Sequence, residues 1–508
     1  MIMQAFTAIF TPVCLGLIIF GTILGIVFGS IPGLSATMAV VLFLPITFGM
    51  EPTNGISLLV GLYMGGISGG LISAILLKIP GTPSSISTVF DGAPMAERGE
   101  AGRALGVGIL FSFIGSIFGI LALWFISPLL AKVTLLFSAA DYFSVAVFAL
   151  TIIASLSGKD MLSGLLSGLL GIALAMVGMA PIDAATRFNF GNYQLLSGFD
   201  ITVLLIGVFA VTDIIMVGFG RRNLSKKAEK KPYQLKGYGL SMKEFIQQIP
   251  NVIRSSVIGV GIGILPGIGG STAGLLSYTA AKNSSKYPEK FGTGIIDGII
   301  ASESSNNAVI GGSLVPLLCM GIPGNTVTAV FLGGLTIHGI SPGPLIFTKS
   351  GNIVYGIYLA LIVSSVVMLV FERLGLPLFV KLLDIPKHIL LPIIMVLCCV
   401  GAYSSNNRAF DVYCVLGFGI LGLVLKKLKI PSTPLIIGFI LGSMFEENLR
   451  QALQASHGSW SIFVTRPISL CFLLVAVISC ALTVRKNLKD KKTAALAGAS
   501  FHTEEEEG

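Results

Sequence analysis

Long apolar stretches separated by short polar ones run through almost the whole chain. They lie near residues 8–31, 33–48, 55–79, 104–130, 142–157, 161–180, 201–219, 251–265, 291–321, 351–371, 389–402, 410–425, 433–445 and 467–484. Because about 20 apolar residues in a helix cross the hydrocarbon core of a bilayer, the longer stretches are long enough to span it. The pattern predicts an all-α integral membrane protein with about 12 transmembrane helices, some of them broken or re-entrant.

The composition agrees with a lipid environment. Hydrophobic residues make up 54% of the chain and charged residues only 11%, whereas a soluble domain carries about 25% charged residues. Glycines recur at every fourth position from Gly21 to Gly33, which predicts a helix face packed closely against another helix. The sequence has no basic stripe with interleaved aromatic residues, so we expect no nucleic-acid partner.

A polar segment divides the apolar stretches into two groups. It covers residues 221–248, and its basic residues are Arg221, Arg222, Lys226, Lys227, Lys230, Lys231, Lys236 and Lys243. The segment after Val484 is basic as well, and basic loops of membrane proteins gather on the cytoplasmic side. The predicted organisation is therefore a first membrane repeat (1–220), a basic cytoplasmic linker (221–248), a second membrane repeat (249–484) and a cytoplasmic tail (485–508).

The two groups of apolar stretches repeat each other. Residues 25–33 read GIVFGSIPG and residues 259–267 read GVGIGILPG, an offset of 234 positions (259 − 25). Farther along, the segment 68–82 resembles the segment 311–326, and the prolines of their Pro-Gly pairs, Pro80 and Pro323, differ by 243 positions (323 − 80). Two Pro-Gly motifs in the same order predict an internal duplication.

Basic residues near these motifs predict that the two repeats are inverted. After the first motif the loop 49–55 has no basic residue, whereas its counterpart in the second half carries Lys282, Lys286 and Lys290. After the second motif the bias is reversed, since Arg98 and Arg103 lie in the first half and Lys349 alone in the second. Basic loops face the cytoplasm, so the two halves should insert in opposite directions.

Four Pro-Gly breaks, at Pro32, Pro80, Pro266 and Pro323, interrupt the apolar stretches. Bare backbone at membrane depth occurs only where it is buried in protein or lines a watery cavity, and a helix that starts there points free N–H groups at an anion. Polar residues follow each break, and we predict a substrate site made of Ser35, Thr37, Gly81, Thr82, Ser84, Gly324, Asn325 and Thr326. Lys78 either balances an anionic substrate or reaches the membrane surface. The alternative for the breaks is a set of kinked helices whose hydroxyl groups only cap them.

A dense polar run, SESSNN at 302–307, lies between apolar neighbours. A carboxylate at the centre of a membrane helix costs about 2.5–3.5 kcal/mol, so Glu303 should face a cavity, a partner or a cation. Hydroxyl and amide oxygens near broken helices suit sodium. We predict an ion site made of Ser271, Thr272, Glu303, Asn306 and Asn307, the alternative being that the run lies at the membrane surface.

An enzymatic function is the weaker interpretation. Residues 66–70 read GISGG, which matches a serine-hydrolase motif, but Ser68 lies in a helix-length apolar stretch and the hydrolase motif needs a preceding strand and a base. The histidines, His338, His388, His457 and His502, lie in predicted loops or the tail. The sequence contains no HExxH, P-loop or complete Rossmann motif. We therefore expect no enzyme activity, no cofactor and no metal beyond sodium.

The residues around the breaks resemble a known family. The segments 30–50, 63–106, 263–278 and 314–344 resemble the large membrane subunit of the tripartite tricarboxylate transporters, and the similarity runs over about residues 11–484. The resemblance implies a secondary, ion-coupled importer of citrate-like di- and tricarboxylates in the inner membrane of a bacterial cell. It also implies two partners, a small four-span membrane subunit and a periplasmic binding protein that delivers the substrate.

The resemblance and the breaks together predict how the substrate binds. The carboxylates would meet helix N-termini at Thr82 and Asn325, and the halves would move against each other for alternating access. A sodium gradient is the expected driving force, and a proton gradient is the less favoured one. A passive anion channel is the alternative function, and an intramembrane serine hydrolase is the least favoured.

Overall fold

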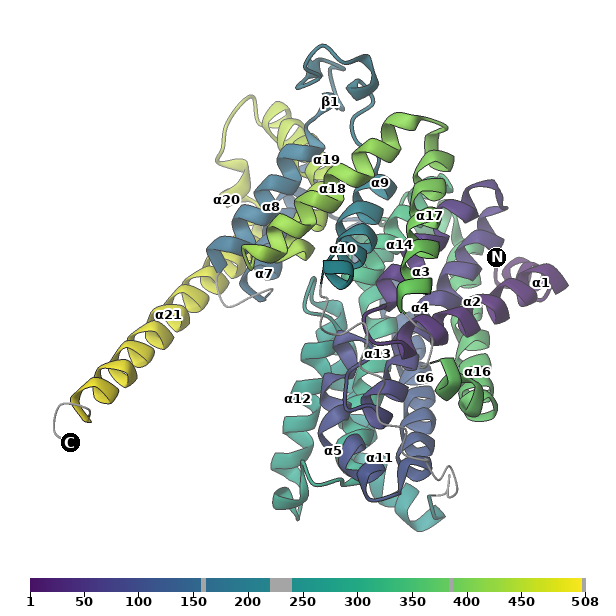
Figure 1. Cartoon of the computed structure of the whole chain (residues 1–508). Helices are drawn as coiled ribbons and strands as arrows, with labels where there is room; N and C mark the ends of the chain where they lie inside the picture. Colours follow the sequence, from purple (N-terminus) through teal and green to yellow (C-terminus); the bar gives the residue numbers. More distant parts are fainter. Residues whose placement is uncertain (157–160, 220–239, 383–386, 505–508) are drawn as a thin grey trace. The chain divides into compact units, whose positions relative to one another are not determined.

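The computed structural model describes residues 1–156, 161–219, 240–382 and 387–504, and these residues are almost wholly helical (Figure 1). The predicted linker lies outside the described residues as far as position 239, and so do residues 505–508 of the predicted tail. The described strands are β1 (Gly178–Met179) and β2 (Thr186–Arg187), a short antiparallel pair. The predicted all-α class is confirmed.

The chain forms two compact units, each built from separate parts of the sequence. The first comprises Met1–Leu136 and Asp200–Val424, and the second comprises Phe137–Phe199 and the residues from Leu425 onward. The first unit contains α1 (Ile2–Ile9), α2 (Pro12–Ser30), α3 (Ala36–Phe43), α4 (Pro52–Leu76), α5 (Ile86–Glu97), α6 (Ala101–Thr134), α9 (Ile201–Leu205), α10 (Thr212–Phe219), α11 (Met242–Ile264), α12 (Gly269–Ser284), α13 (Ile296–Met320), α14 (Thr326–Ile337), α15 (Ile346–Lys349), α16 (Gly351–Leu382), α17 (Lys387–Asn406) and most of α18 (Ala409–Lys427). The second contains α7 (Ala139–Leu156), α8 (Met161–Ala175), α19 (Ser432–Ala455), α20 (Ile462–Thr465) and α21 (Pro467–Glu504).

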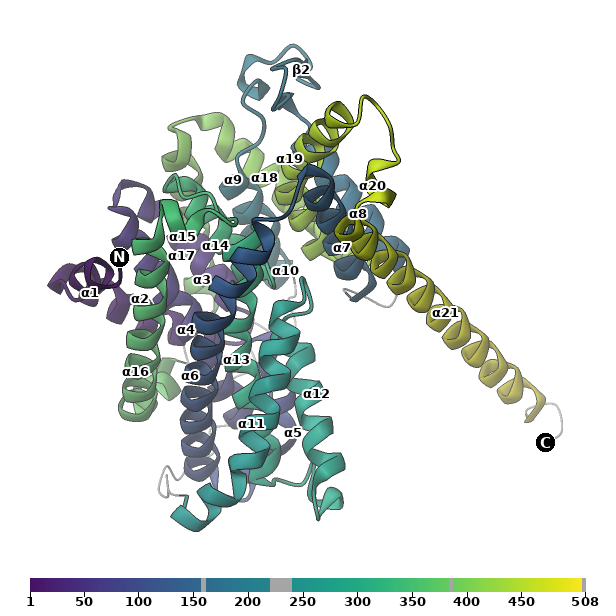
Figure 2. The ribbon, with the colours of Figure 1, turned by 180° about the vertical axis from the view of Figure 1, so that it is seen from behind.

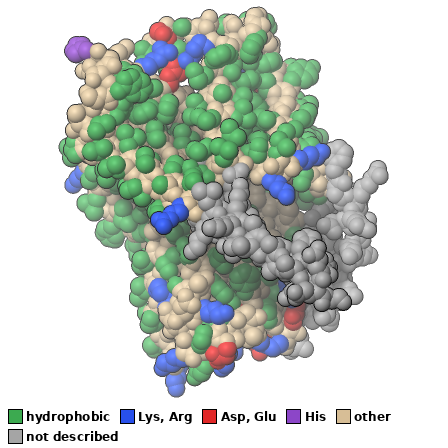
Figure 3. Space-filling model, turned by 90° about the vertical axis from the view of Figure 1, so that its left-hand side faces the viewer, with side chains coloured by type: hydrophobic (Ala, Val, Ile, Leu, Met, Phe, Trp, Pro, Cys, Tyr) green, Lys and Arg blue, Asp and Glu red, His purple; other side chains and the backbone are tan. Residues whose placement is uncertain are grey.

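The helices include many that suit a bilayer. Among the described residues, 7 helical segments are long and apolar enough to cross a membrane: Pro12–Ser30, Pro52–Leu76, Ala101–Thr134, Ile201–Gly218, Gly351–Phe379, Ala409–Lys427 and Pro467–Arg485. Shorter apolar helices cover Ala36–Gly49, Ala139–Ile152, Met161–Ala175, Thr326–Ile337 and Ile389–Ser404. Hydrophobic side chains cover most of the described surface in Figure 3, and charged side chains are few there. The protein is therefore a multi-pass membrane protein.

Two helices, α4 and α13, form the buried centre of the first unit (Figure 2). Every residue from Gly55 to Leu76 in α4 is buried, and so is every residue from Gly298 to Cys319 in α13. These two helices end at the breaks around Pro80 and Pro323. The breaks thus adjoin the most enclosed helices of the unit.

Glycine lets a neighbouring helix approach each central helix closely. A methyl group at Gly25 or Gly29 of α2 would collide with backbone atoms of α4 at Gly65, Gly66 or Leu62. Gly21 meets α4 in the same way, so the predicted packing face is confirmed at these positions. In the second half, Gly259 and Gly263 of α11 meet backbone atoms of α13 at Ser305, Gly312 and Ser313.

Each central helix also packs against an outer helix from the other half of the sequence. In the first unit α6 packs against α13, and α16 packs against α4. Glycines again set the spacing, because Gly115 and Gly119 of α6 lie against the backbone of α13 at Ser304 and Ala308. Each central helix is thus enclosed by helices from both halves of the sequence.

The second unit is a bundle of α7, α8, α19 and α21. Gly171 of α8 lies against the Leu435 backbone, and Gly438 of α19 lies against Gly168, so α8 and α19 pack through small residues. At one end of the bundle Arg187 binds both Glu446 oxygens, at 2.6 and 3.0 Å. These contacts join the loop that contains β1 and β2 to α19.

Candidate functional site

The first break of each half is a tight turn between two helices. In the first half α2 ends at Ser30, Gly33 has φ 96°, and α3 begins after Ser35, whose hydroxyl accepts a hydrogen bond from the Met38 amide at 3.1 Å. In the second half α11 ends at Ile264, Gly267 in the turn has φ 78°, and Gly269, the first residue of α12, has φ 71°. A positive φ favours glycine, which explains why glycines mark both turns.

The second break of each half is also capped. After α4, the backbone turns through residues 77–82 into the short helix η2 (Pro83–Ser85) and then α5. After α13, Gly321 takes the left-handed conformation and Asn325 caps α14, its side chain accepting from the Thr328 amide at 2.9 Å. Lys78, in the first of these breaks, has φ 56° and forms an exposed ion pair with Glu97 at 3.3 Å. Its ammonium group is thus directed at a surface carboxylate.

The two second breaks make matching contacts. A methyl group at Gly81 would collide with the Gly29 carbonyl and with Gly70, and one at Gly324 would collide with the Gly263 carbonyl and Ser313. Gly81 and Gly324 are separated by the 243 positions of the sequence match (324 − 81), and Gly29 and Gly263 by the 234 positions (263 − 29). Gly81 and Gly324 therefore let each second break pack closely on the two preceding helices, α2 and α4 in the first half and α11 and α13 in the second.

Breaks of different halves meet in two places. The hydroxyls of Thr37, at the start of α3, and Thr326, at the start of α14, lie 3.2 Å apart. In the second place, Ser84 of η2 lies beside Gly270 in the first turn of α12. Each contact joins the first break of one half to the second break of the other.

Other side chains predicted to bind substrate form hydrogen bonds with neighbouring protein groups. The Thr82 hydroxyl lies 3.1 Å from that of Ser84, and the Ser85 hydroxyl donates to the Thr82 carbonyl at 2.9 Å. The Asn325 amide nitrogen donates to the Tyr63 hydroxyl at 2.8 Å, and Tyr63 also contacts Ser313 at 2.9 Å. These side chains shape the breaks.

The polar run 302–307 lies in the middle of α13, and all of its residues are buried. The run is therefore enclosed by other parts of the protein. The Glu303 carboxylate accepts hydrogen bonds from Thr88 of α5, from Ser112 of α6 at 2.9 Å and from the Asn307 amide at 3.4 Å. Among the residues that the structure describes, no basic side chain pairs with it. Glu303 is therefore a carboxylate held by neutral donors.

Several buried polar atoms near Glu303 have no hydrogen-bond partner among the described residues. They are the hydroxyls of Ser302, Ser304 and Ser305, both amide atoms of Asn306 and the amide oxygen of Asn307. The Asn306 oxygen faces Gly270 of α12, as does Ser84. An unpartnered buried polar atom costs about 1–3 kcal/mol, so these groups point to a polar ligand. Oxygens of this kind suit a sodium ion.

The positions of Ser271 and Thr272 fit the same region. Both lie half-buried in the first turn of α12, directly after Gly270. The start of α12, Asn306 and Ser84 therefore come together from three different segments. We call Ser84, Gly270 and Asn306 the α12 cluster.

A second buried carboxylate, Glu372 of α16, was not among the predicted residues. Its side chain is fully buried, one oxygen accepts from Ser68 at 2.9 Å, and the other has no partner among the described residues. Ser68 is the serine of the hydrolase-like motif, and its described hydrogen bond goes to this carboxylate. The contact assigns Ser68 a role as a hydrogen-bond donor between α4 and α16.

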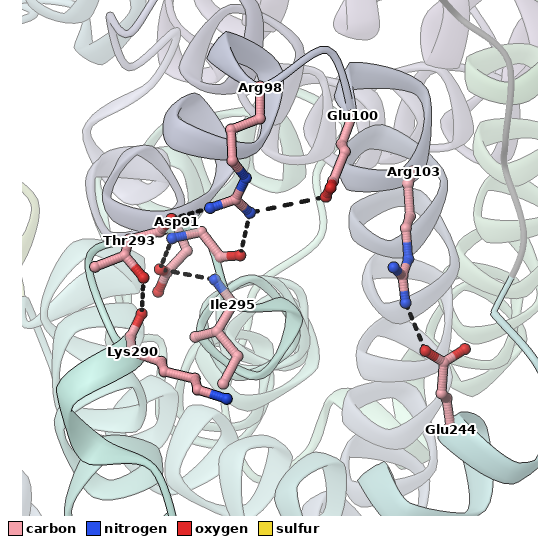
Figure 4. Close-up of polar contacts among 9 residues, drawn as sticks. Asp91, Arg98, Glu100, Arg103, Glu244, Lys290, Thr293 and Ile295 are labelled. Atoms are coloured by element: carbon pink, nitrogen blue, oxygen red, sulfur yellow. Dashed lines mark hydrogen bonds and ion pairs between the residues drawn. The ribbon is translucent and has the colours of Figure 1, made fainter.

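A polar clasp fixes the start of α13 (Figure 4). One oxygen of the buried Asp91 accepts hydrogen bonds from the amides of Gly292, Gly294 and Ile295, at 2.9, 2.8 and 3.0 Å. Arg98 donates to the carbonyls of Thr293 and Gly294. Asp91 lies in α5 and Arg98 directly follows it. Contacts from α5, the helix after the Pro80 break, therefore fix the segment just before α13, the helix that carries Glu303.

Comparison with known proteins assigns the family. Residues 15–437 match the Tripartite tricarboxylate transporter TctA family. The chain is 35% identical over 489 residues to an uncharacterized 52.8 kDa protein in the TAR-I ttuC' 3'region of Agrobacterium vitis, which covers 96% of both chains. It is also 37% identical over 231 residues to an uncharacterized protein in the TAR-II ttuC' 3'region of the same organism, covering 46% of this chain and 96% of that one. No solved structure matches. The chain therefore belongs to the TctA family of tripartite tricarboxylate transporters.

Proposed function

We propose that this protein imports citrate-like di- or tricarboxylates across the inner membrane of a bacterial cell, driven by a sodium gradient. It would work with a small four-span membrane subunit and with a periplasmic binding protein that delivers the substrate. The family supports transport, and the seven long apolar helices among the described residues support a multi-pass protein. The proposed topology has two inverted repeats, with the 221–248 linker and the 485–508 tail in the cytoplasm.

The observation that carries the proposal is the α12 cluster beside the polar run of α13. The buried Asn306 side chain, whose oxygen has no described hydrogen-bond partner, lies where the first helix turn after the Pro266 break meets Ser84 of the Pro80 break. Amide groups at the start of α12 favour an anion, and the Glu303 carboxylate with the oxygens of Asn306 and Asn307 favours a cation. Carboxylate and sodium would thus bind side by side and neutralise each other.

The matched contacts at the breaks support a duplicated architecture. Gly29, Gly70 and Gly81 in the first half correspond in sequence offset and in contact to Gly263, Ser313 and Gly324 in the second. A related pair of broken helices, one from each half, is the arrangement in which many secondary transporters hold substrate and ion. Movement of one break against the other would expose the site to either side in turn.

Uptake assays test the proposed coupling. Vesicles containing both membrane subunits, with the binding protein outside, should accumulate labelled citrate above its external concentration when sodium is higher outside than inside. Dissipating the sodium gradient with an ionophore should leave only equilibration. A passive channel would give the same final internal concentration with and without the gradient, and that result would reject coupled transport.

A further inference from the structure

We propose that Glu372 is a proton-binding site, separate from the sodium site around Glu303. Its role in transport rests on the proposed function, whereas its protonation does not. Glu372 lies in α16 with no exposed surface, and one of its oxygens has no partner among the described residues. The proposal assigns a ligand, the proton, to that oxygen.

Among the residues that the structure describes, no basic side chain forms an ion pair with Glu372. The helices packed against α16 are α1, α2, α4, α6 and α15. Of these, α1, α2 and α4 contain no Asp, Glu, His, Lys or Arg; α6 contains Arg103 and Lys132, and α15 contains Lys349. Arg103 is paired with Glu244 at 2.5 Å. The remaining basic side chains of these helices and of α16 itself are exposed: Lys132, Lys349, Arg373 and Lys381.

Glu303 of α13 is also a buried carboxylate, and α13 packs against α4 as α16 does. Two like charges in an enclosed apolar region repel each other, so protonation of one carboxyl group lowers the free-energy cost of burying both. Apolar side chains of α4 and α16, among them Ile72, Ile75 and Leu376, pack together one turn beyond Glu372. Water therefore gives little screening at this place.

The hydrogen bonds decide which carboxyl group holds the proton. Glu303 accepts from Thr88, Ser112 and Asn307, and donors to a carboxylate favour its charged form. Among the described residues, the hydrogen-bond donor to Glu372 is Ser68. A proton on the bare oxygen of Glu372 removes its charge, while Glu303 stays ionised and able to bind sodium.

Protonation of Glu372 would be linked to the Pro80 break through the helices on either side of that break. Ser68 lies on α4, which leads into the Pro80 break, and Thr88 lies on α5, which follows it. Loss of the proton would leave a second negative charge in the group of helices that holds Glu303, because α4 packs against both α13 and α16, and would raise the attraction of this region for a cation. Sodium binding at Glu303 and proton binding at Glu372 should therefore influence each other.

Infrared spectroscopy of the purified protein tests the protonation directly. Protonated carboxyl groups absorb in a separate carbonyl region from carboxylates, so the wild type should show a buried protonated band at neutral pH. The band should vanish in Glu372→Gln and remain in the matched surface variant Glu97→Gln. A band lost in Glu303→Gln but kept in Glu372→Gln would place the proton on the other carboxyl and overturn the proposal, as would a wild type without the band.

Two further measurements separate this proposal from the transport function. Ser68→Ala removes the donor to Glu372, so it should shift the band even if Glu372→Gln folds poorly; an unshifted band would contradict the assignment. In vesicles, Glu372→Gln should flatten the pH dependence of sodium-driven uptake, and an unchanged pH profile would deny the proton a part in transport. If the vesicles accumulate no carboxylate at all, the proposed function fails while the infrared result still stands.

Discussion

Thr37 and Thr326, which are 289 positions apart in sequence, lie with their hydroxyl oxygens 3.2 Å apart. Each begins a helix that follows a Pro-Gly break, one in each half of the chain. The pair shows that the breaks of the two halves meet through polar groups. The following changes test what those groups do.

Replacing either threonine tests the proposed substrate contacts. Thr37→Val and Thr326→Val should each weaken carboxylate affinity by about tenfold, because a hydrogen bond to a charged group is worth roughly 1.5–3 kcal/mol. Equilibrium binding to purified protein measures this. Thr336→Val is the matched control, since its hydroxyl donates to the Leu332 carbonyl within the same helix, α14. Equal affinity in all these variants would place the substrate elsewhere.

Thr82→Ala and Asn325→Ala should also weaken carboxylate affinity by about tenfold if these residues contact the substrate. Asn325→Ala should in addition lower stability by about 1 kcal/mol, because the residue caps α14. Affinity and melting temperature should therefore be measured together. A lower melting temperature with unchanged affinity in both variants would assign these side chains to the helix caps alone.

Glu303→Gln tests the sodium site. The change keeps the shape of the side chain but removes the charge, so it should raise the sodium concentration needed for half-maximal uptake by at least about tenfold. Glu97→Gln at the surface is the control with the same chemical change. A sodium dependence like that of the wild type would show that Glu303 does not bind the ion.

Glycine substitutions test the close packing of the breaks. Gly81→Ala and Gly324→Ala would push a methyl group into the backbone of the preceding helices, and overpacking of this kind costs about 1–3 kcal/mol. Gly16→Ala should be tolerated, because no atom lies within 4 Å of the added methyl group. Thermal unfolding of the purified variants distinguishes them. Melting temperatures unchanged at positions 81 and 324 would contradict the packing described.

The clasp at the start of α13 should contribute to stability. Asp91→Asn replaces a charged acceptor of three backbone hydrogen bonds by a neutral one and should lower stability by about 2 kcal/mol. Asp183→Asn changes an exposed ion pair with Arg450 and should have little effect. Equal melting temperatures for the two variants would show that the clasp does not hold the loop.

Much of the site could be predicted from the sequence because broken helices leave a local signal. Pro-Gly pairs followed by hydroxyl residues mark the breaks. The cost of a carboxylate in a membrane helix predicts that Glu303 faces a cavity, a partner or a cation, and in the structure Thr88 and Ser112 donate hydrogen bonds to it. The matching offsets also predict which glycines make equivalent contacts. These features depend on short segments, so one sequence suffices to find them.

Other parts depend on contacts between distant segments and could not be predicted. Glu372 is followed by Arg373 near the end of an apolar stretch, which resembles a surface pair, and only the packing of α16 on α4 buries it. Tyr63 looks like an ordinary core residue until Asn325 is placed beside it. Asp91 accepts a hydrogen bond from Gly292, in a loop 201 positions later in the sequence.

The most direct measurement is carboxylate binding to the purified protein in sodium and in choline, for the wild type and for Asn306→Leu. Coupled transport at the α12 cluster requires that sodium and substrate strengthen each other's binding, so wild-type affinity should be at least about tenfold higher in sodium. Asn306→Leu removes amide atoms that face Gly270 and should abolish that difference, whereas Thr336→Val should keep it. Wild-type affinity that is the same in sodium and in choline would contradict sodium coupling, and an Asn306→Leu variant that keeps the sodium effect would contradict the site.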